Sequence, residues 1–488
     1  MKIVLLNTDD SRGGAARAAI RLHRALLERG DASTLLVRRR TGLHDHVPGI
    51  VQASEQPDPP YARLVQEWYI DHRRTEASET IFSGGLFGVD VADHPAVLQA
   101  DILNLHWVAG FLRPSGIGKL LNLNKPVLWT LHDQWPMTGG CHYTAGCRQF
   151  TEMCRACPQL EGDEVGLVPA AFLDRLESFG SRITAVTPSD WLARQARASR
   201  IFRDARVEAI PNAVDHDVFR PLPKLPLRQK FGIPANQFVM LFACSAGFEK
   251  RKGIPLFRAL LKEIGSEVFS LFVGWHTAES GKIPGQKHFG FVNDDALLCE
   301  IYNAADVLVH LASEDNLPNM PLEAMACGTP VLGLRNGGLP EIVDHQQSGL
   351  LTPAGDFVAL VSAAQSLMHN SKLCASYGAA ARGTVEKRFT RALQASRYAA
   401  LYSKLAAPAS GAAPPGRSHV AEKMYDLLAI SAEWHLREEL NALQEQNARL
   451  ERRIRKLERN IGYRVVSGLA NSVRNLGRAL RGKSSGRS

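Results

Sequence analysis

The stretch SEDNLPNMPLEAMACGTPVLG, Ser313–Gly333, reads as an acidic loop that leads into a helix and then into a short apolar strand. Asn319 is placed to cap the helix and Pro321 falls in its first turn, so free backbone amides point at the loop and favour an anion. Asp315 lies before the helix and Glu323 about one turn inside it. Two carboxylates can therefore hold hydroxyls of a sugar or ribose while the amides hold phosphate, which suits a nucleotide sugar.

Short apolar runs alternate with loops and helical patterns on both sides of this stretch. The N-terminus, MKIVLLNTDDSRGGAARAAIRLHRALLERG, reads as strand, loop and helix, and further strands are expected at ASTLLV, ADILNLHW and KPVLWTLHD. After the turn-rich IPNAVDHDVFRPLPK the pattern restarts with FVMLFACSA, VFSLFVGW, ADVLVHLA and TPVLGL. This alternation predicts two α/β domains with mostly parallel sheets, residues 1–209 and 210–405. Ligands in such sheets bind at the carboxyl ends of the strands.

Length and composition exclude several classes of protein. The chain of 488 residues is too long for one core, and its 45% hydrophobic and 22% charged residues are those of an ordinary globular protein. Its apolar runs fall short of the roughly 18 residues that a membrane span requires, so we expect a cytoplasmic protein. The formal net charge is +9, but residues 463–488 hold six basic residues and no acid. The body is nearly neutral, so a nucleic-acid partner is not expected.

The C-terminal part is predicted to consist of a linker and a coiled coil. Residues 406–420 include AAPASGAAPPGRS, which cannot bury a core and is read as a linker. Residues 421–462 carry a heptad seam, which predicts a coiled coil and a homodimer, with Asn447 fixing the register. The alternative is a helix that packs on its own protein. The seam is formed by Leu436, Leu440, Leu443, Asn447, Leu450, Ile454, Leu457 and Ile461.

The last segment, residues 463–488, is predicted to be a basic amphipathic tail. Its apolar residues from Val465 to Leu480 recur at helical spacing, and its charges are all positive. Such a helix could bind the anionic inner face of the cytoplasmic membrane, at about 1 kcal/mol per basic residue. The alternative is a solvated tail, because Gly462, Gly468 and Gly477 weaken the helix.

Four cysteines lie close together in the loop 139–160, spaced Cys141-x5-Cys147-x6-Cys154-x2-Cys157. Four thiolates at this spacing can close a tetrahedral zinc site, and the last pair has the spacing of a zinc knuckle. The alternatives are disulfides or free buried thiols, and His142 is a competing ligand. A zinc site here would shape the loop and perform no chemistry. The remaining cysteines, Cys244, Cys299, Cys327 and Cys374, are scattered, which fits a reducing compartment.

The loop TDDSRGGAARA near the N-terminus is a weaker candidate site. Gly13 and Gly14 lie just before a helix, where a backbone free of side chains can approach a phosphate. A plain tight turn before the helix explains the two glycines equally well.

Several motifs, taken together, resemble one enzyme family. Asp315 to Glu323 is similar to the E-x7-E signature of retaining GT-B glycosyltransferases of the family 4 (group 1) type, with Asp in place of the first Glu. EAMACGTPV and NGGLPEIV follow it as in the family. GGAARA, LHD at Leu131–Asp133, VTPSDWLA, IPNAVD, KRKG at Lys250–Gly253 and ADVLVHLA precede it in the family's order. The resemblance covers Met1 to about Leu405 and implies two Rossmann-like domains that face a cleft, with no cofactor for catalysis.

The resemblance implies a role for each matching residue. Glu323 would hold the donor ribose, and Asp315 would bind hydroxyls of the donor sugar. Because Asp is one methylene shorter than Glu, the neighbouring Glu314 is an alternative for that contact. Lys252 matches the lysine that neutralises the diphosphate leaving group. His132, at the end of the strand KPVLWTLHD, matches the histidine that faces the reacting sugar, and Asp133 beside it would orient the loop.

The same comparison supplies the rest of the donor site. The family arginine six positions before Lys252 is Ala246 here, so Arg251 or Lys250 would have to compensate. Gly290, Phe291 and Val292 would frame the nucleobase through backbone contacts, with a buried turn as the rival interpretation. The candidate donor-binding residues are thus Gly13, Gly14, Gly290, Phe291, Val292, Arg251, Glu314, Asn316 and Asn319, beside the catalytic set of His132, Lys252, Asp315 and Glu323.

The resemblance implies a retaining hexosyltransferase that moves a sugar from a UDP- or GDP-sugar to a glycan acceptor. The motif style is similar to bacterial enzymes of exopolysaccharide and lipopolysaccharide biosynthesis, so the expected acceptor is lipid-linked and lies at the inner face of the cytoplasmic membrane. The leaving diphosphate would assist the incoming hydroxyl, and the protein would contribute positioning and charge stabilisation. The alternative is a catalytically impaired, dimeric scaffold that binds nucleotide sugars. An epimerase would need an acid–base pair at the sugar that the sequence does not offer.

Overall fold

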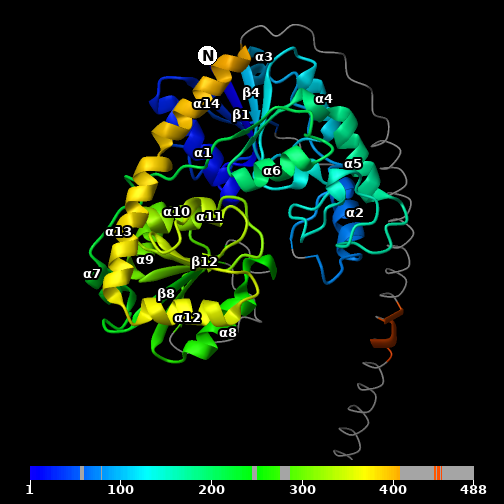
Figure 1. Ribbon diagram of the computed structural model, residues 1–488. Coiled ribbons are helices and arrows are strands. Elements are labelled where there is room, and N and C mark those ends of the chain that lie inside the picture. The colour runs from blue at the N-terminus through cyan, green and yellow to red at the C-terminus, as the bar shows by residue number, and fades with distance from the viewer. Residues whose placement is uncertain are drawn as a thin grey trace, which may run out of the picture. The chain divides into compact units, whose positions relative to one another are not determined.

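A computed structural model describes residues 1–54, 60–78, 80–244, 250–274 and 286–406, together with 445–446, 448–450 and 452. The chain divides into two compact units, Met1–Tyr425 and Asp426–Ser488. The first unit contains two parallel sheets with helices around them (Figure 1). The prediction of an α/β fold is therefore confirmed.

The first sheet has seven described strands in the order β3-β2-β1-β4-β5-β6-β7, all parallel. They are β1 (Lys2–Asp9), β2 (Ala32–Arg39), β3 (Ile50–Gln52), β4 (Ile102–Leu105), β5 (Val127–Thr130), β6 (Thr184–Thr187) and β7 (Val207–Ala209). β1 is buried from its second residue onward, which explains its continuous apolar run: helices cover both faces of a parallel sheet.

The second sheet has six described strands, all parallel, in the order β10-β9-β8-β11-β12-β13. They are β8 (Phe238–Ala243), β9 (Val268–Val273), β10 (Gln286–His288), β11 (Val307–His310), β12 (Val331–Leu334) and β13 (Gly349–Thr352). Both sheets reverse their strand order near the middle, at β1/β4 and at β8/β11. Loops at such switch points lie beside the carboxyl ends of the strands and are where ligands bind in this class of sheet.

The helices that surround the first sheet are α1 (Gly13–Glu28), α2 (Pro60–Asp71), α3 (Pro95–Gln99), α4 (Pro114–Leu121), α5 (Leu167–Ser178) and α6 (Asp190–Ala198). Those that follow are α7 (Lys224–Phe231), α8 (Ile254–Ile264), α9 (Asp295–Ala304), α10 (Asn319–Ala326), α11 (Leu339–Ile342), α12 (Phe357–Met368), α13 (Ser371–Arg388) and α14 (Arg391–Ala406). Short 3-10 turns occur at η1 (Trp135–Met137), η2 (Gln149–Thr151), η3 (Gly180–Arg182) and η4 (Lys250–Lys252).

The last of these helices, α14, returns to the first sheet (Figure 1). Tyr398 and Tyr402 are buried in the same core as residues of β1 and β2. Tyr398 shares a hydrogen bond with Thr130 at 3.0 Å, and Asn104 donates to Tyr402 Oη at 2.9 Å. The range 210–405, read from the sequence as the second domain, therefore ends in a helix that packs on the first.

The predicted linker, coiled coil and basic tail fall mostly outside the described residues. Of residues 406–488, the structure describes Ala406 and the few positions between 445 and 452, which are helical. Glu445 and Arg449 form an i,i+4 ion pair at 3.9 Å there. The homodimer seam and the membrane-binding tail stay predictions. Within the described residues, the helices are too short or too polar to cross a membrane.

Candidate active site

Asp315, a candidate catalytic residue of the second domain, lies in the loop between β11 and α10, and Lys252 reaches it from η4. Lys252 Nζ donates to Asp315 Oδ2 at 2.8 Å, and Arg251 Nη1 lies 3.7 Å from the same oxygen. His310 Nε2, at the end of β11, is also 3.7 Å away. Burial by itself raises the pKa of Asp315, but Lys252 and Arg251 hold it well below its usual range. Asp315 is thus a carboxylate inside a cationic pocket.

Glu314 faces a different partner, the loop 139–160 of the first domain. Its carboxylate accepts hydrogen bonds from the Ala145 amide at 3.1 Å and from Thr144 Oγ1 at 3.4 Å. Tyr143 in the same loop donates to Asp315 Oδ1 at 3.2 Å, and the Arg251 guanidinium stacks 3.9 Å above the Tyr143 ring. Burial raises the pKa of Glu314. The two neighbouring acids therefore occupy different environments.

Glu323, inside α10, is almost fully buried and is bound by the first domain. Arg21 Nη2 donates to its Oε1 at 2.6 Å, Arg17 Nη1 lies 3.5 Å from the same oxygen, and Tyr302 Oη donates to Oε2 at 2.8 Å. Burial raises the pKa of Glu323, but Arg21 and Arg17 offset this effect and lower it overall. Both arginines lie on α1, four residues apart on one helix face.

The N-terminus of α10 differs in one respect from the sequence expectation. Asn319 does not cap the helix. Pro318 occupies the cap position with extended backbone angles, and Asn319 is the first helical residue. Its side-chain amide donates to Gly14 O at 2.9 Å, which joins the glycine loop of the first domain to this helix end. Gly13 has a φ of +84°, a conformation that favours glycine.

His132 lies at the end of β5 on the first domain, as predicted. Its Nε2 shares a hydrogen bond with His106 Nδ1 at 2.9 Å. Burial lowers the pKa of His132 to about 4, so the ring is neutral at physiological pH. The side chain of Asn316 donates to the carbonyls of Leu131 and His132 and accepts from Ser189, so it joins the two domains. Its polar atoms are engaged within the protein.

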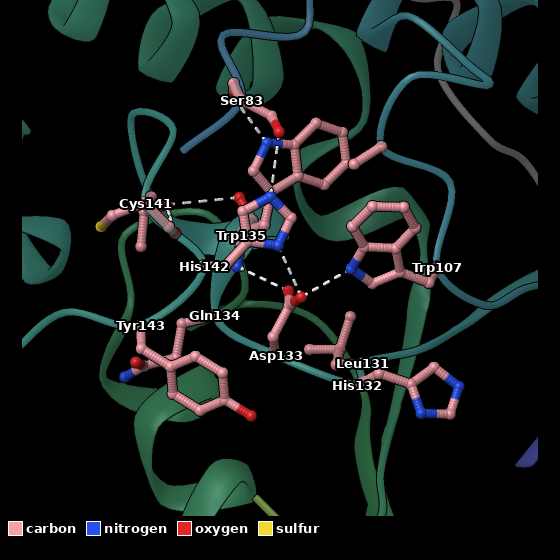
Figure 2. Close-up of polar contacts among 12 residues, drawn as sticks. Ser83, Trp107, Leu131, His132, Asp133, Gln134, Trp135, Cys141, His142 and Tyr143 are labelled. Atoms are coloured by element: carbon pink, nitrogen blue, oxygen red, sulfur yellow. Dashed lines mark hydrogen bonds and ion pairs between the residues drawn. The ribbon is translucent and has the colours of Figure 1, made fainter. Parts of the chain in front are cut away.

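Asp133 anchors the loop that follows His132. Its Oδ2 accepts from Trp107 Nε1 and His142 Nδ1, both at 2.7 Å, and its Oδ1 accepts from the Trp135 amide (Figure 2). The ring of His132 points away from this network. Asp133 thus positions the loop, in agreement with the role expected of it.

The remaining candidates are placed as follows. Gly290 has a φ of +66°, Phe291 is half-buried and Val292 is buried, in the segment between β10 and α9. Ala246 lies outside the described residues. Cys141, Cys147, Cys154 and Cys157 are free thiols that line one small cavity. Across the described residues, no three His, Cys, Asp or Glu side chains are gathered so that they could hold a metal ion.

Sequence reasoning did not find the partners that bind the candidate acids. Arg17, Arg21 and Tyr143 lie in the first domain, about 170 to 300 positions away from the acids they contact. The i,i+4 spacing of the two arginines behind the glycine loop was the only available signal. Tyr302 and His106 carried none, because each lies in an ordinary buried context.

The chain has two α/β domains with parallel sheets, and buried acids and cations lie where their loops meet. This arrangement is the GT-B fold. The chain matches the family model described as Glycosyltransferase Family 4 over residues 12–218 and the model described as Glycosyl transferases group 1 over residues 224–384. Together the two models span most of the chain, and it belongs to this family of glycosyltransferases.

Relatives and solved structures agree with this assignment. WcaC of Escherichia coli, named for glycosyl transfer in colanic acid biosynthesis, is 25% identical over 379 residues, which cover 72% of this chain and 86% of WcaC. A D-inositol 3-phosphate glycosyltransferase of Nocardiopsis dassonvillei is 27% identical over 370 residues, covering 70% and 77%. Anabaena HepE, solved with UDP and glucose, has the same fold, with a TM-score of 0.58 at 17% identity, covering 83% and 100%.

Proposed function

We propose that this glycosyltransferase transfers a hexose, with retention of configuration, from a UDP- or GDP-sugar to a lipid-linked glycan in bacterial envelope polysaccharide biosynthesis. The observation that carries the proposal is the buried pair of Lys252 and Asp315 in front of α10, with the buried Glu323 inside the same helix. A carboxylate for ribose, a cation for diphosphate and helix amides for phosphate are the groups that a nucleotide sugar requires. The name of WcaC, a colanic acid biosynthesis glycosyl transferase, supports the polysaccharide setting, and the HepE complex with UDP supports a nucleotide-sugar donor.

The proposed reaction breaks the bond between the anomeric carbon and the diphosphate oxygen and forms a bond to the acceptor oxygen on the same face. The proton of the acceptor hydroxyl passes to the leaving diphosphate. Lys252 and Arg251, both less than 10% exposed, would stabilise the negative charge that develops on that diphosphate. Neutral His132 would orient sugar hydroxyls by hydrogen bonding.

A cavity in the first domain could receive the acceptor. Its volume is about 510 Å³, within the usual range for small-molecule sites, and Arg39, Arg74, Ser83 and Trp107 are among its lining residues. Trp107 also donates to Asp133, so the cavity wall is joined to the loop that follows His132. The arginines of this lining are paired with acids, Arg39 with Asp9 and Arg74 with Asp71, so the ring and the hydroxyl groups suit a glycan without selecting its charge. Binding of the basic tail to an anionic bilayer and pairing of the coiled coil are further parts of the proposal.

Release of nucleoside diphosphate from a panel of UDP- and GDP-sugars tests the proposal. The purified full chain is supplied with a bacterial extract of lipid-linked glycans, and Glu323→Gln and Lys252→Gln are compared with the exposed controls Glu263→Gln and Lys262→Gln. We expect turnover of one donor that both site variants lose and both controls keep.

Two other outcomes would contradict the proposal. If a nucleoside diphosphate binds but no donor turns over with any acceptor fraction, the chain is the catalytically impaired scaffold. If neither UDP nor GDP binds, the assigned donor site is wrong. Product analysis by NMR distinguishes retention from inversion at the anomeric carbon.

A further inference from the structure

The four clustered cysteines line one small cavity. Cys141, Cys147, Cys154 and Cys157 all line a cavity of about 20 Å³ beside η2, together with apolar side chains such as Phe150. A space of this size has room for about one water-sized particle, or one metal ion. The lining takes in four cysteines from positions up to sixteen residues apart in the sequence.

The ligand set of this cavity would contain sulfur alone. His142, the competing ligand by sequence, is engaged at both ring nitrogens: Nδ1 with Asp133 at 2.7 Å and Nε2 with Ser83 Oγ at 3.1 Å. The sulfur of Cys141 points away from this network (Figure 2). All four cysteines are free thiols rather than disulfides. Soft thiolate ligands select zinc over harder cations.

A buried arginine beside the cavity is left without a carboxylate partner. Arg175 on α5 is fully buried, stacks 4.5 Å from the Trp135 ring and donates only to backbone carbonyls, among them Thr138 O at 3.1 Å. Among the described residues, no carboxylate lies within ion-pair distance of it, and its Nε has no hydrogen-bond partner. A buried cation that lacks a direct ion pair is costly. Negative charge nearby would remove that cost.

The sulfur atoms can supply this charge. Thr138, whose carbonyl accepts from Arg175 Nη1 at 3.1 Å, lines the same cavity as Cys141 and Cys154. The guanidinium therefore lies beside the cysteine cluster, where thiolates bound to a metal ion would offset its charge.

We propose that Cys141, Cys147, Cys154 and Cys157 bind one structural zinc ion, with Arg175 as the buried counter-charge. The four thiols lose their protons to solvent and form four Zn–S bonds of about 2.3 Å. The resulting centre carries two negative charges, of which Arg175 offsets one. Because the thiols are not yet gathered at metal-binding distance, they must turn inward when the ion binds.

The consequence of the ion lies at the opposite side of the loop. Tyr143, Thr144 and Ala145 lie between Cys141 and Cys147 in the sequence and contact Asp315 and Glu314 of the second domain. A zinc ion between Cys141 and Cys147 would fix both ends of this contact segment. The ion would therefore position the loop against the donor-side acids without touching substrate.

Metal analysis of the full chain tests the proposal directly. We expect about one zinc per chain after purification without added metal, and a loss of at least tenfold in zinc affinity for Cys157→Ser and Cys147→Ser. Both positions are half-buried, so the loss of packing is small. Cys374→Ser, a buried thiol outside the cluster, is the matched control and should keep the zinc. Cobalt in place of zinc should give the absorption bands of a tetrahedral thiolate site.

Limited proteolysis gives a second measurement that is independent of enzyme activity. Arg148 and Arg155 are exposed between the cysteines, so trypsin should cut there faster after a chelator removes the ion, and readdition of zinc should restore protection. The proposal is overturned if the native chain holds no metal and all four thiols react with a thiol reagent. It is also overturned if these cysteines are found as disulfides, or if Cys374→Ser loses zinc as the cluster variants do.

Discussion

Replacement of Asp315 by Asn should destabilise the second domain, because it leaves two buried cations facing each other. Asp315 Oδ2 lies 2.8 Å from Lys252 Nζ and 3.7 Å from Arg251 Nη1. At an effective dielectric of about 20, these distances correspond to attractions of about 6 and about 4.5 kcal/mol. Desolvation of the carboxylate offsets much of this sum, and removal of one partner of such a buried pair costs about 3–5 kcal/mol.

Urea denaturation followed by tryptophan fluorescence and circular dichroism measures this loss in the free energy of unfolding. The control is Glu386→Gln, which breaks a largely exposed i,i+4 pair with Arg382 and should cost about 0.5 kcal/mol or less. UDP or GDP should bind Asp315→Asn more tightly than the wild type, because its phosphates replace the lost anion. A free energy of unfolding within about 1 kcal/mol of the wild type would refute the reasoning.

Two further predictions concern stability. Tyr402→Phe removes the hydroxyl that accepts from Asn104 and leaves a buried amide unpaired, so it should cost about 1–3 kcal/mol in unfolding free energy. The control Tyr377→Phe should cost far less, because the Tyr377 hydroxyl makes no hydrogen bond within the described part of the chain. His132 and His310 have pKa values lowered to about 4 by burial, below the ordinary 6.5, so the unfolded chain binds more protons and stability should fall as pH drops from 6.5 toward 4. The double variant His132→Gln/His310→Gln should lose less stability than the wild type over that pH range. Equal losses in the two proteins, or a flat wild-type profile, would contradict this origin.

The sequence pattern predicted the two sheets well, because alternating apolar runs and helices carry that information locally. It also proposed Asp315, Lys252 and Glu323 as site residues: Lys252 contacts Asp315 in front of α10 and Glu323 lies inside that helix, while their roles stay predictions. It could not show that α14 packs on the first sheet, since an amphipathic helix reads the same whichever core it covers. The cap at Asn319 was wrong because the extended Pro318 takes that position and the asparagine amide turns to Gly14 instead.

If the donor binds as proposed, the contacts between the two domains would couple donor binding to domain position. In the proposed donor site, a ribose that takes the oxygens of Glu323 must share or replace the hydrogen bond from Arg21 at 2.6 Å. The affinity for the donor would then equal the free energy of its new contacts minus that of the Arg21–Glu323 contact it replaces. By linkage, donor binding and the contact between α1 and α10 would affect each other by the same free energy. Because Tyr143 and Ala145 also contact the neighbouring acids from the first domain, donor binding and the arrangement of the cysteine loop are connected through Asp315 and Glu314.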